Sequence, residues 1–201
     1  MPSRFYKKLL KTYGPQSWWP VFGPKKSAQF EIAIGAILTQ NTSWINVEKA
    51  LRNLIMARML SPEAIMACHP ARLKTLIRPA GYYNQKAKKL RLFSQWLLKN
   101  HGGKLEKLFA LPTTQARAGL LTQWGIGPET ADSIILYAGN KPVFVIDTYT
   151  KRFLAGHGIV FKTYQEYQNY FHTHLPRSAK LYNEFHALLV VWGKNVSRRK
   201  K

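Results

Sequence analysis

The sequence is poor in cysteine and in long apolar runs. It has one cysteine, Cys68, among 201 residues, so it cannot form an internal disulfide or supply four thiolates to an iron–sulfur cluster. No stretch is long and apolar enough to span a bilayer, and no signal peptide opens the chain. These absences exclude a disulfide scaffold and an integral membrane protein. We expect a cytoplasmic protein with no cofactor.

Acidic side chains are also scarce. Nine Asp and Glu residues stand against 31 Lys and Arg residues, which gives a formal net charge of +22, and residues 198–201 end the chain as a basic tail. Such an excess usually indicates a polyanionic partner, most often nucleic acid. A solubility feature and a membrane-surface protein are the alternatives. The hydrophobic share of 46% is enough to bury a core.

Apolar residues recur at helical spacing along most of the chain. The stretch from Phe30 to Leu38 is apolar almost all round, which predicts a buried central helix. Ser61 followed by Pro62 predicts a helix start with the serine as its cap. Further helices are expected at 5–13 and 44–55, from Pro70, from Asn84 as N-cap, from Thr113, and at 148–154, 164–175 and 178–192. We predict an all-α protein with a six-helix lobe at about 30–140 and a second lobe of residues 1–29 plus 141–201.

One stretch, from Trp124 to Phe153, organises the rest of the chain. Gly125 and Gly127 form a tight turn, where glycine permits positive φ and close approach of another backbone. Pro128 has its φ preset for the first position of a helix, which we expect to end at Gly139. The N–H groups of the turn and of the helix N-terminus suit a phosphate oxygen. A purely structural turn is the alternative.

This stretch resembles the helix-hairpin-helix motif, at about 114–139, and the following acidic loop of the endonuclease III superfamily of DNA glycosylases. The family pattern L-x-G-x-G-x-x-T-A is matched at Gly125, Gly127, Thr130 and Ala131. Residues 145–149 match the V-D-T-H segment, with Tyr149 where His is common. The resemblance implies two helical lobes with a cleft between them that binds DNA and holds the active site. It also implies a monomer that binds double-stranded DNA with damaged bases and associates through it with a bacterial nucleoid.

Asp147, one of two aspartates in the sequence, is the candidate catalytic residue. The helix N-terminus and the surrounding positive charge should keep its carboxyl ionised. In the family, the Asp at this point stabilises the oxocarbenium-like charge of the breaking glycosidic bond or orients the attacking water. Asp147 is also expected to be the N-cap of the next helix. Asp132 is expected to be a surface or capping group.

The sequence departs from the family pattern at two places. Glu129 stands where bifunctional relatives carry a lysine that forms a Schiff base with the sugar, so the resemblance implies a monofunctional enzyme that uses water. Residues 193–197 stand where many relatives begin a four-cysteine iron–sulfur motif, with Ser197 at the first cysteine position. We place Glu129 and Lys194 among the pocket residues. The alternatives are a favourable charge at a helix terminus for Glu129 and a solvated side chain for Lys194.

Tryptophans supply the expected base pocket. Trp18, Trp19 and Pro20 lie in a proline-bounded loop, and Trp44 begins a helix. These residues either cap the core or form a stacking wall for a base. Cluster-free relatives with the Trp-Trp-Pro and Leu-Thr-Gln-Asn-Thr segments include bacterial 3-methyladenine DNA glycosylases. An N-alkylated purine is cationic, and aromatic faces attract such a cation at roughly 0.5–2 kcal/mol each.

The DNA-binding residues implied by the resemblance are Gln40, Asn41, Lys86, Gly125, Gly127 and Thr130. In relatives the Gln enters the space left by the flipped nucleotide, and a helix cap is the alternative for Gln40. Lys86 begins a basic helix with Lys88, Lys89 and Arg91, most of which we expect to be solvated. Family members often hold a monovalent cation in the hairpin, so Gly125–Gly127 is a candidate cation site. No other metal is expected.

These observations predict a DNA N-glycosylase of base excision repair. It flips alkylated purines such as 3-methyladenine out of the duplex and removes them hydrolytically, without AP-lyase activity. The alternatives are a monofunctional glycosylase for mismatched or oxidised bases and a damaged-DNA-binding protein without catalysis. The carboxylate of Asp147 argues against the last, because an anion that faces the DNA backbone gives a pure binder no advantage.

Overall fold

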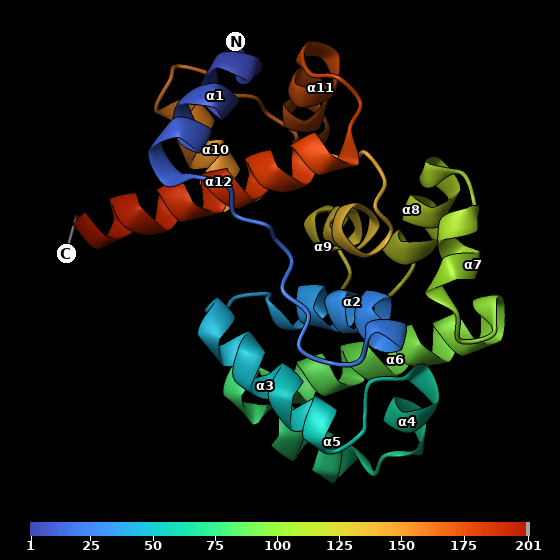
Figure 1. Ribbon diagram of the computed structural model, residues 1–201. Helices are drawn as coiled ribbons and strands as arrows, with labels where there is room; N and C mark the ends of the chain where they lie inside the picture. Colours follow the sequence, from blue (N-terminus) through green and yellow to red (C-terminus); the bar gives the residue numbers. More distant parts are fainter. Residues whose placement is uncertain (200–201) are drawn as a thin grey trace. The chain divides into compact units, whose positions relative to one another are not determined.

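The computed structural model describes the backbone of residues 1–199 and the side chains of residues 1–196. Ser197 and the predicted basic tail at 198–201 lie outside the described side chains. All regular structure in the described part of the chain is helical, and no strand occurs there (Figure 1). The predicted all-α class is confirmed. Backbone contacts divide the chain into two units, and the lobe limits predicted at residues 29 and 140 stay a prediction.

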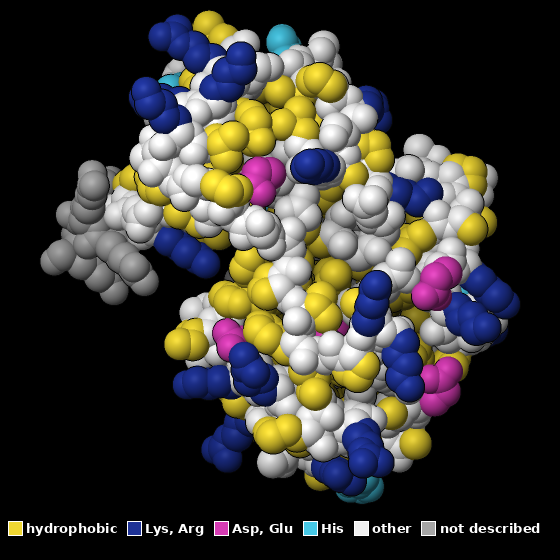
Figure 2. Space-filling model, in the orientation of Figure 1, with side chains coloured by type: hydrophobic (Ala, Val, Ile, Leu, Met, Phe, Trp, Pro, Cys, Tyr) yellow, Lys and Arg dark blue, Asp and Glu magenta, His cyan; other side chains and the backbone are white. Residues whose placement is uncertain are grey.

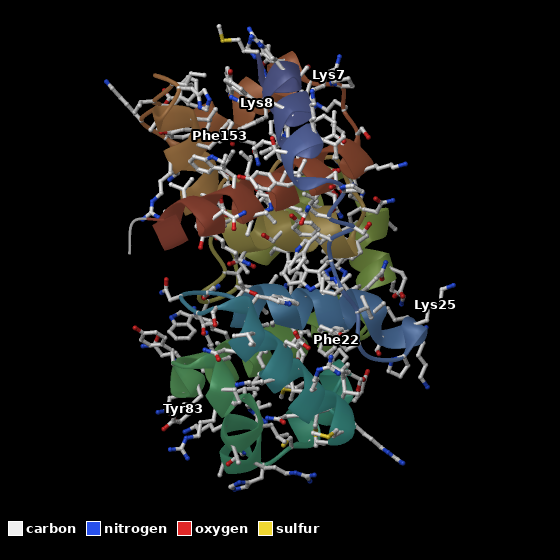
Figure 3. The ribbon with its side chains drawn as sticks, turned by 60° about the vertical axis from the view of Figure 1, so that its left-hand side comes forward. Lys7, Lys8, Phe22, Lys25, Tyr83 and Phe153 are labelled. Atoms are coloured by element: carbon white, nitrogen blue, oxygen red, sulfur yellow. The ribbon has the colours of Figure 1, made fainter. Side chains whose placement is uncertain are left out.

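The first unit consists of Met1–Pro20 and the chain from Asn140 onward. Its helices are α1 (Pro2–Tyr13), α10 (Thr148–Ala155), α11 (Tyr164–His174) and α12 (Ala179–Arg199). The long helix α12 packs against both α1 and α10. Phe153 of α10, labelled in Figure 3, contacts the rings of Phe5 and Trp192 edge-on and so joins these three helices.

An aromatic core fixes the segment that leads to Asp147. Phe144 stacks on Phe171 of α11 with ring centroids 3.7 Å apart, and Phe185 of α12 lies edge-on to both rings. Val143–Ile146 belongs to no helix and is buried. Its backbone bonds to side chains of α11 rather than to a strand: Phe144 N donates to His172 Nε2 at 3.0 Å, and Gln168 Nε2 donates to Phe144 O at 2.8 Å. These contacts fix the backbone of Val143–Ile146 directly before Asp147.

The second unit, Val21–Gly139, is built around α2. Its elements are η1 (Lys25–Ser27), α2 (Ala28–Leu38), α3 (Trp44–Met56), α4 (Pro62–Ala67), α5 (Pro70–Ile77), η2 (Arg78–Ala80), α6 (Tyr83–His101), α7 (Leu105–Ala110), α8 (Thr113–Leu121), α9 (Pro128–Ser133) and the π-helix η3 (Ile134–Ala138). All residues from Phe30 to Leu38 are buried, as predicted. The helix packs against α3, α6, α9 and η3.

Several helix starts were predictable from their caps, and one was not. Ser61 accepts a hydrogen bond from Ala64 N, so the predicted cap of α4 is confirmed. The prediction of Asn84 as an N-cap is wrong. The N-cap of α6 is Tyr82, in the left-handed region with φ of 45°, and Asn84 lies inside the first turn.

Basic side chains are distributed unevenly between solvent and interior. Figure 2 shows Lys and Arg over the visible face of each unit, with few acidic groups among them. Arg91 is one of the four basic residues of α6, most of which were expected to be solvated, and it is partly buried. Its Nη1 donates to the carbonyls of Ile65 and Met66 at 3.2 Å and of Cys68 at 3.0 Å, so its charge satisfies the C-terminal end of α4.

Candidate functional site

The carboxylate of Asp147 is held at the start of α10. It is the N-cap residue, and its Oδ1 accepts a hydrogen bond from Thr150 N at 2.7 Å. The predicted N-cap role is therefore confirmed. The residue is only 9% exposed. Because the buried Val143–Ile146 segment precedes it and a helix follows it, the backbone on both sides of the carboxylate is fixed.

His186 of α12 lies against the second carboxylate oxygen. Its Nε2 is 3.5 Å from Asp147 Oδ2, and its side chain is buried. Burial raises the pKa of the Asp147 carboxyl, but the charge and hydrogen bond of His186 and the hydrogen bonds of Thr150 outweigh burial and hold this pKa below its ordinary value. The carboxylate is therefore ionised at neutral pH, in surroundings with little water.

Sequence reasoning missed His186. One signal was available: His186 falls four residues after Tyr182 and three before Leu189, on a helix face that is buried. A histidine on such a face needs a polar partner. The partner cannot be identified from sequence, because Asp147 is 39 positions away on another element.

The hairpin between α8 and α9 matches the predicted turn. Gly125 has φ of 79°, in the left-handed region. A Cβ there would collide with the stem of Lys89, so glycine is needed on both counts. Gly127 differs, because its φ is −92° and a Cβ there would meet no atom within 4 Å. No contact within the protein therefore requires glycine at position 127. Because the position is exposed and the space around it is open, the backbone there is accessible to another molecule.

A buried ion pair joins the two helices of the hairpin. Arg117 of α8 contacts both carboxylate oxygens of Asp132 in α9, with Nε at 2.6 Å and Nη2 at 3.1 Å. Asp132 is completely buried, so its expected role as a surface or capping group is wrong. A bidentate pair of this kind sets the geometry of the two helices and hence of the turn.

Gln40 is bonded to the hairpin. Its Nε2 donates to Gly125 O at 3.0 Å and to Thr130 Oγ1 at 2.9 Å, and its Oε1 accepts from Lys89 Nζ. Burial lowers the pKa of Lys89. Asn41, next to Gln40, is exposed with φ of 53° and lines a groove with Gln40, Tyr82, Gln85, Lys86 and Lys89. Gln40 is thus joined to two other predicted DNA-binding residues, Gly125 and Thr130, and Asn41 is its neighbour in the chain.

Lys86 has a different environment from the one predicted. It is 2% exposed, and its Nζ donates to Leu38 O at 2.8 Å and to Ala80 O at 2.7 Å. Burial, followed by the nearby charge of Lys89, lowers the pKa of Lys86 to about 8. Its ammonium joins α6 to the end of α2 and to the turn before Tyr82. This placement argues against a direct phosphate contact, and we do not carry Lys86 into the DNA-binding surface.

The predicted pocket residues fall in both units. Trp18, Trp19 and Pro20 are half-buried in the first unit, with the two indole rings 5.2 Å apart at 54°. Lys194 is exposed on α12 of the same unit. In the second unit, Trp44 is half-buried at the start of α3 and Glu129 is exposed in the first turn of α9. The first unit therefore carries Asp147 together with the paired indoles.

Neither a metal cluster nor a membrane helix is present in the part of the chain that the structure describes. No group of three or more His, Cys, Asp or Glu there is arranged to hold a metal ion. None of the described helices is long and apolar enough to cross a membrane.

Comparison with known proteins identifies the family. Residues 34–177 match the HhH-GPD superfamily of base excision DNA repair proteins, and the chain belongs to this superfamily. A Methanocaldococcus jannaschii protein, whose name proposes a DNA repair glycosylase, is 42% identical over 200 residues that cover 98% of this chain and 89% of that protein. Endonuclease III of Thermotoga maritima is 30% identical over 132 residues, which are 64% of this chain and 56% of that enzyme.

Solved structures agree with this assignment. H. pylori 3-methyladenine DNA glycosylase MagIII, bound to 1,N6-ethenoadenine, has a TM-score of 0.83 and 33% identity over 97% of this chain and 98% of that one. A trapped endonuclease III–DNA covalent intermediate has a TM-score of 0.78 over 97% of this chain and 87% of that one. Its identity is 17%, so that likeness shows the fold alone. The chain is a DNA glycosylase of base excision repair, as its sequence motifs predicted.

Proposed function

We propose that the protein is a monofunctional DNA glycosylase that removes N-alkylated purines such as 3-methyladenine. The observation that carries this proposal is the buried, ionised carboxylate of Asp147, held by Thr150 and His186. A fixed anion is suited to a reaction that builds positive charge on a deoxyribose, because it needs little reorganisation as the bond breaks. The similarity to the H. pylori 3-methyladenine enzyme supports the substrate class.

Hydrolysis proceeds through a flipped nucleotide. The glycosidic bond breaks as the base leaves with the bonding electrons, and Asp147 stabilises the oxocarbenium-like sugar. Water then adds to the anomeric carbon and loses a proton, which leaves an abasic site. Glu129 occupies the position at which bifunctional relatives carry the lysine. A carboxylate cannot form a Schiff base with the sugar, so strand cleavage does not follow from this residue.

The lesion itself supplies part of the driving force. An alkylated purine carries a positive charge, which weakens its glycosidic bond and draws it to aromatic faces. Trp18, Trp19 and Trp44 are the proposed stacking partners, with Glu129, Lys194 and Pro20 as further pocket residues. A departing cationic base becomes neutral on leaving, so it needs no general acid.

DNA binding is proposed to use the second unit's hairpin surface. The exposed backbone around Gly127 would approach a phosphate, and Asn41 beside Gln40 would lie against the nucleotide strand. A monovalent cation at the Gly125–Gly127 turn would fit this role. Such contacts position the duplex without reading its sequence.

The test is chromatography of the bases that the protein releases from methylated genomic DNA, with the Asp147→Asn variant as control. We expect free methylated purines with the wild-type protein and far less with the variant. Duplexes that contain a mismatch or 8-oxoguanine serve as competing substrates. If bases were released only from the mismatch or 8-oxoguanine duplexes, the enzyme would act on a different class of lesion. If the protein bound damaged DNA but released no base, it would be a damaged-DNA-binding protein without catalysis.

A further inference from the structure

Glu184 holds the loop that carries the paired tryptophans. We call residues 14–20 the tryptophan loop. Glu184 of α12 accepts hydrogen bonds from Gln16 N at 2.5 Å on Oε1 and from Ser17 N at 3.3 Å on Oε2. These two amides directly precede Trp18. Hydrogen bonds to an ionised acceptor are stronger than neutral ones, so the carboxylate fixes the backbone at the point where the indoles begin.

The backbone conformation of the loop needs such an anchor. Ser17 has φ of 50°, in the left-handed region that residues other than glycine rarely adopt. The residue is exposed, so burial of its side chain does not hold it there. Strained residues of this kind persist only where their surroundings fix them. The bonds to Glu184 supply this, together with those of Gln16 Nε2 to Tyr13 O and Gly14 O at 3.1 and 3.0 Å.

A second carboxylate acts on the chain just after the loop, within the second unit. Glu31 of α2 is completely buried and accepts from Phe22 N at 2.7 Å and from Gly23 N at 2.9 Å. Phe22 is labelled in Figure 3. The backbone is thus bound by a carboxylate before Trp18 and again after Val21. Two of the seven glutamates in the sequence serve this one segment.

The same turn of α12 also carries His186. Side chains two residues apart on a helix point to different sides, so Glu184 and His186 contact separate parts of the first unit. Glu184 contacts the tryptophan loop, and His186 contacts Asp147. The carboxylate of Glu184 also lies near Tyr6, whose pKa is raised by burial and then by this charge.

We propose that Glu184 is a positioning residue for base recognition. It holds Trp18 and Trp19 in the orientation in which their faces bind an alkylated purine, and it acts on the base only through the loop. This inference rests on the proposed function, since it assigns the tryptophan loop to that substrate.

The experiment compares Glu184→Ala and Glu184→Gln with the wild-type protein. Glu48→Ala is the matched control, because Glu48 is a partly exposed glutamate whose ion pair is with Arg52 on its own helix. Melting temperature and single-turnover excision of 3-methyladenine over a range of enzyme concentrations are measured for each. Backbone amide hydrogen exchange of the peptide that contains residues 14–20 measures how well the tryptophan loop is ordered in the absence of any substrate. Both Glu184 variants are then repeated with Trp18 and Trp19 replaced by Ala.

We expect Glu184→Ala to lose about tenfold in excision at limiting enzyme, within the range of about 5- to 150-fold that base–aromatic stacking supplies. Excision at saturating enzyme should fall less, exchange in the loop should rise, and Glu184→Gln should recover part of each, because its amide oxygen still accepts. In the background without the two indoles, Glu184→Ala should cause no further loss, since residues that act as a unit are not additive.

Two results would overturn the inference. One is full activity of folded Glu184→Ala with unchanged loop exchange. The other is an equal loss with and without the indoles, which would mean that Glu184 acts elsewhere. Failure of the proposed function is distinguishable from both, because the wild-type protein would then release no methylated purine while the exchange of the loop would still respond to Glu184.

Discussion

Replacing Asp147 by Asn separates the chemical role of this residue from its structural role. An asparagine keeps a side-chain oxygen that can accept from Thr150 N, the bond that caps α10 at 2.7 Å. Asn and Asp are about equally good N-caps, whereas an Ala at this position costs about 0.5–2 kcal/mol. The Asn variant loses the favourable interaction of a charge with the helix N-terminus, about 0.3–1 kcal/mol, and the contact of that charge with His186. For a chain of this length the helix-terminus part alone is a decrease in melting temperature of at most about 4 °C.

The expected effect on catalysis is much larger. Removal of one electrostatic contact that forms in the transition state typically lowers the rate roughly 10²–10³-fold. Asp147→Asn and Asp147→Ala should therefore lose similar amounts of activity, although the Ala variant should be less stable than the Asn variant by about 0.5–2 kcal/mol. For very labile cationic lesions the loss should be smaller in both variants, because the substrate supplies part of the driving force.

The assay is single-turnover excision of a chemically stable lesion by each variant, paired with a melting curve and a binding isotherm on the same duplex. DNA affinity should stay near the wild-type value. A folded Asp147→Asn protein that excises stable lesions at the wild-type rate would refute the catalytic assignment. The catalytic assignment would also be refuted if Asp147→Ala lost more activity than Asp147→Asn in proportion to its lower melting temperature.

Three further predictions concern the missing lysine, the hairpin and the ionisation of Asp147. Borohydride should trap no covalent enzyme–DNA adduct during excision, because Glu129 replaces the lysine. The abasic product should stay uncut until alkali is added. A trapped adduct would mean that another amine of the protein acts as nucleophile. The logarithm of the DNA-binding constant should fall with the logarithm of the salt concentration, with a slope of about −0.9 per phosphate neutralised. Gly127→Ala should weaken binding to all sequences equally at unchanged stability, whereas Gly125→Ala should also lower stability because of the φ of 79° at Gly125. An affinity of Gly127→Ala equal to that of the wild type would show that the hairpin does not contact DNA. Since the pKa of the Asp147 carboxyl is lowered in the folded state, its contribution to stability should be present above the unfolded value of about 3.9 and be lost as the pH falls through the lower folded value. The free energies of unfolding of wild type and Asp147→Asn, measured with denaturant, should therefore converge as the pH falls below about 4.

The features predicted correctly from sequence are those that depend on near neighbours. The cap at Ser61, the cap at Asp147 and the turn at Gly125 each follow from residues within four positions. The buried helix from Phe30 to Leu38 follows from composition alone, because no face of it is polar enough for solvent. These local rules were sufficient for the all-α class and for the position of the candidate carboxylate.

The features missed are polar contacts between distant parts of the chain. Arg117 and Asp132 lie on different helices, and their pairing turns an expected surface group into a buried one. His186 reaches Asp147, and Glu184 reaches Gln16, across more than 35 and 160 positions respectively. A charged residue in the sequence gives no sign of whether water or a distant backbone will satisfy it. The same limit explains why the sequence did not predict the burial of Lys86.

The environment of Lys86 gives the chain an internal reporter of local opening. Burial lowers the pKa of its ammonium to about 8 in the folded protein, and this shift is lost when the side chain reaches water. The side chain is 2% exposed, so an acylating reagent in solution cannot reach it while α6 stays docked on the end of α2. Modification of Lys86 must wait for a transient separation of those helices, and its rate, read by mass spectrometry of the labelled peptide, measures how often the second unit opens at that point.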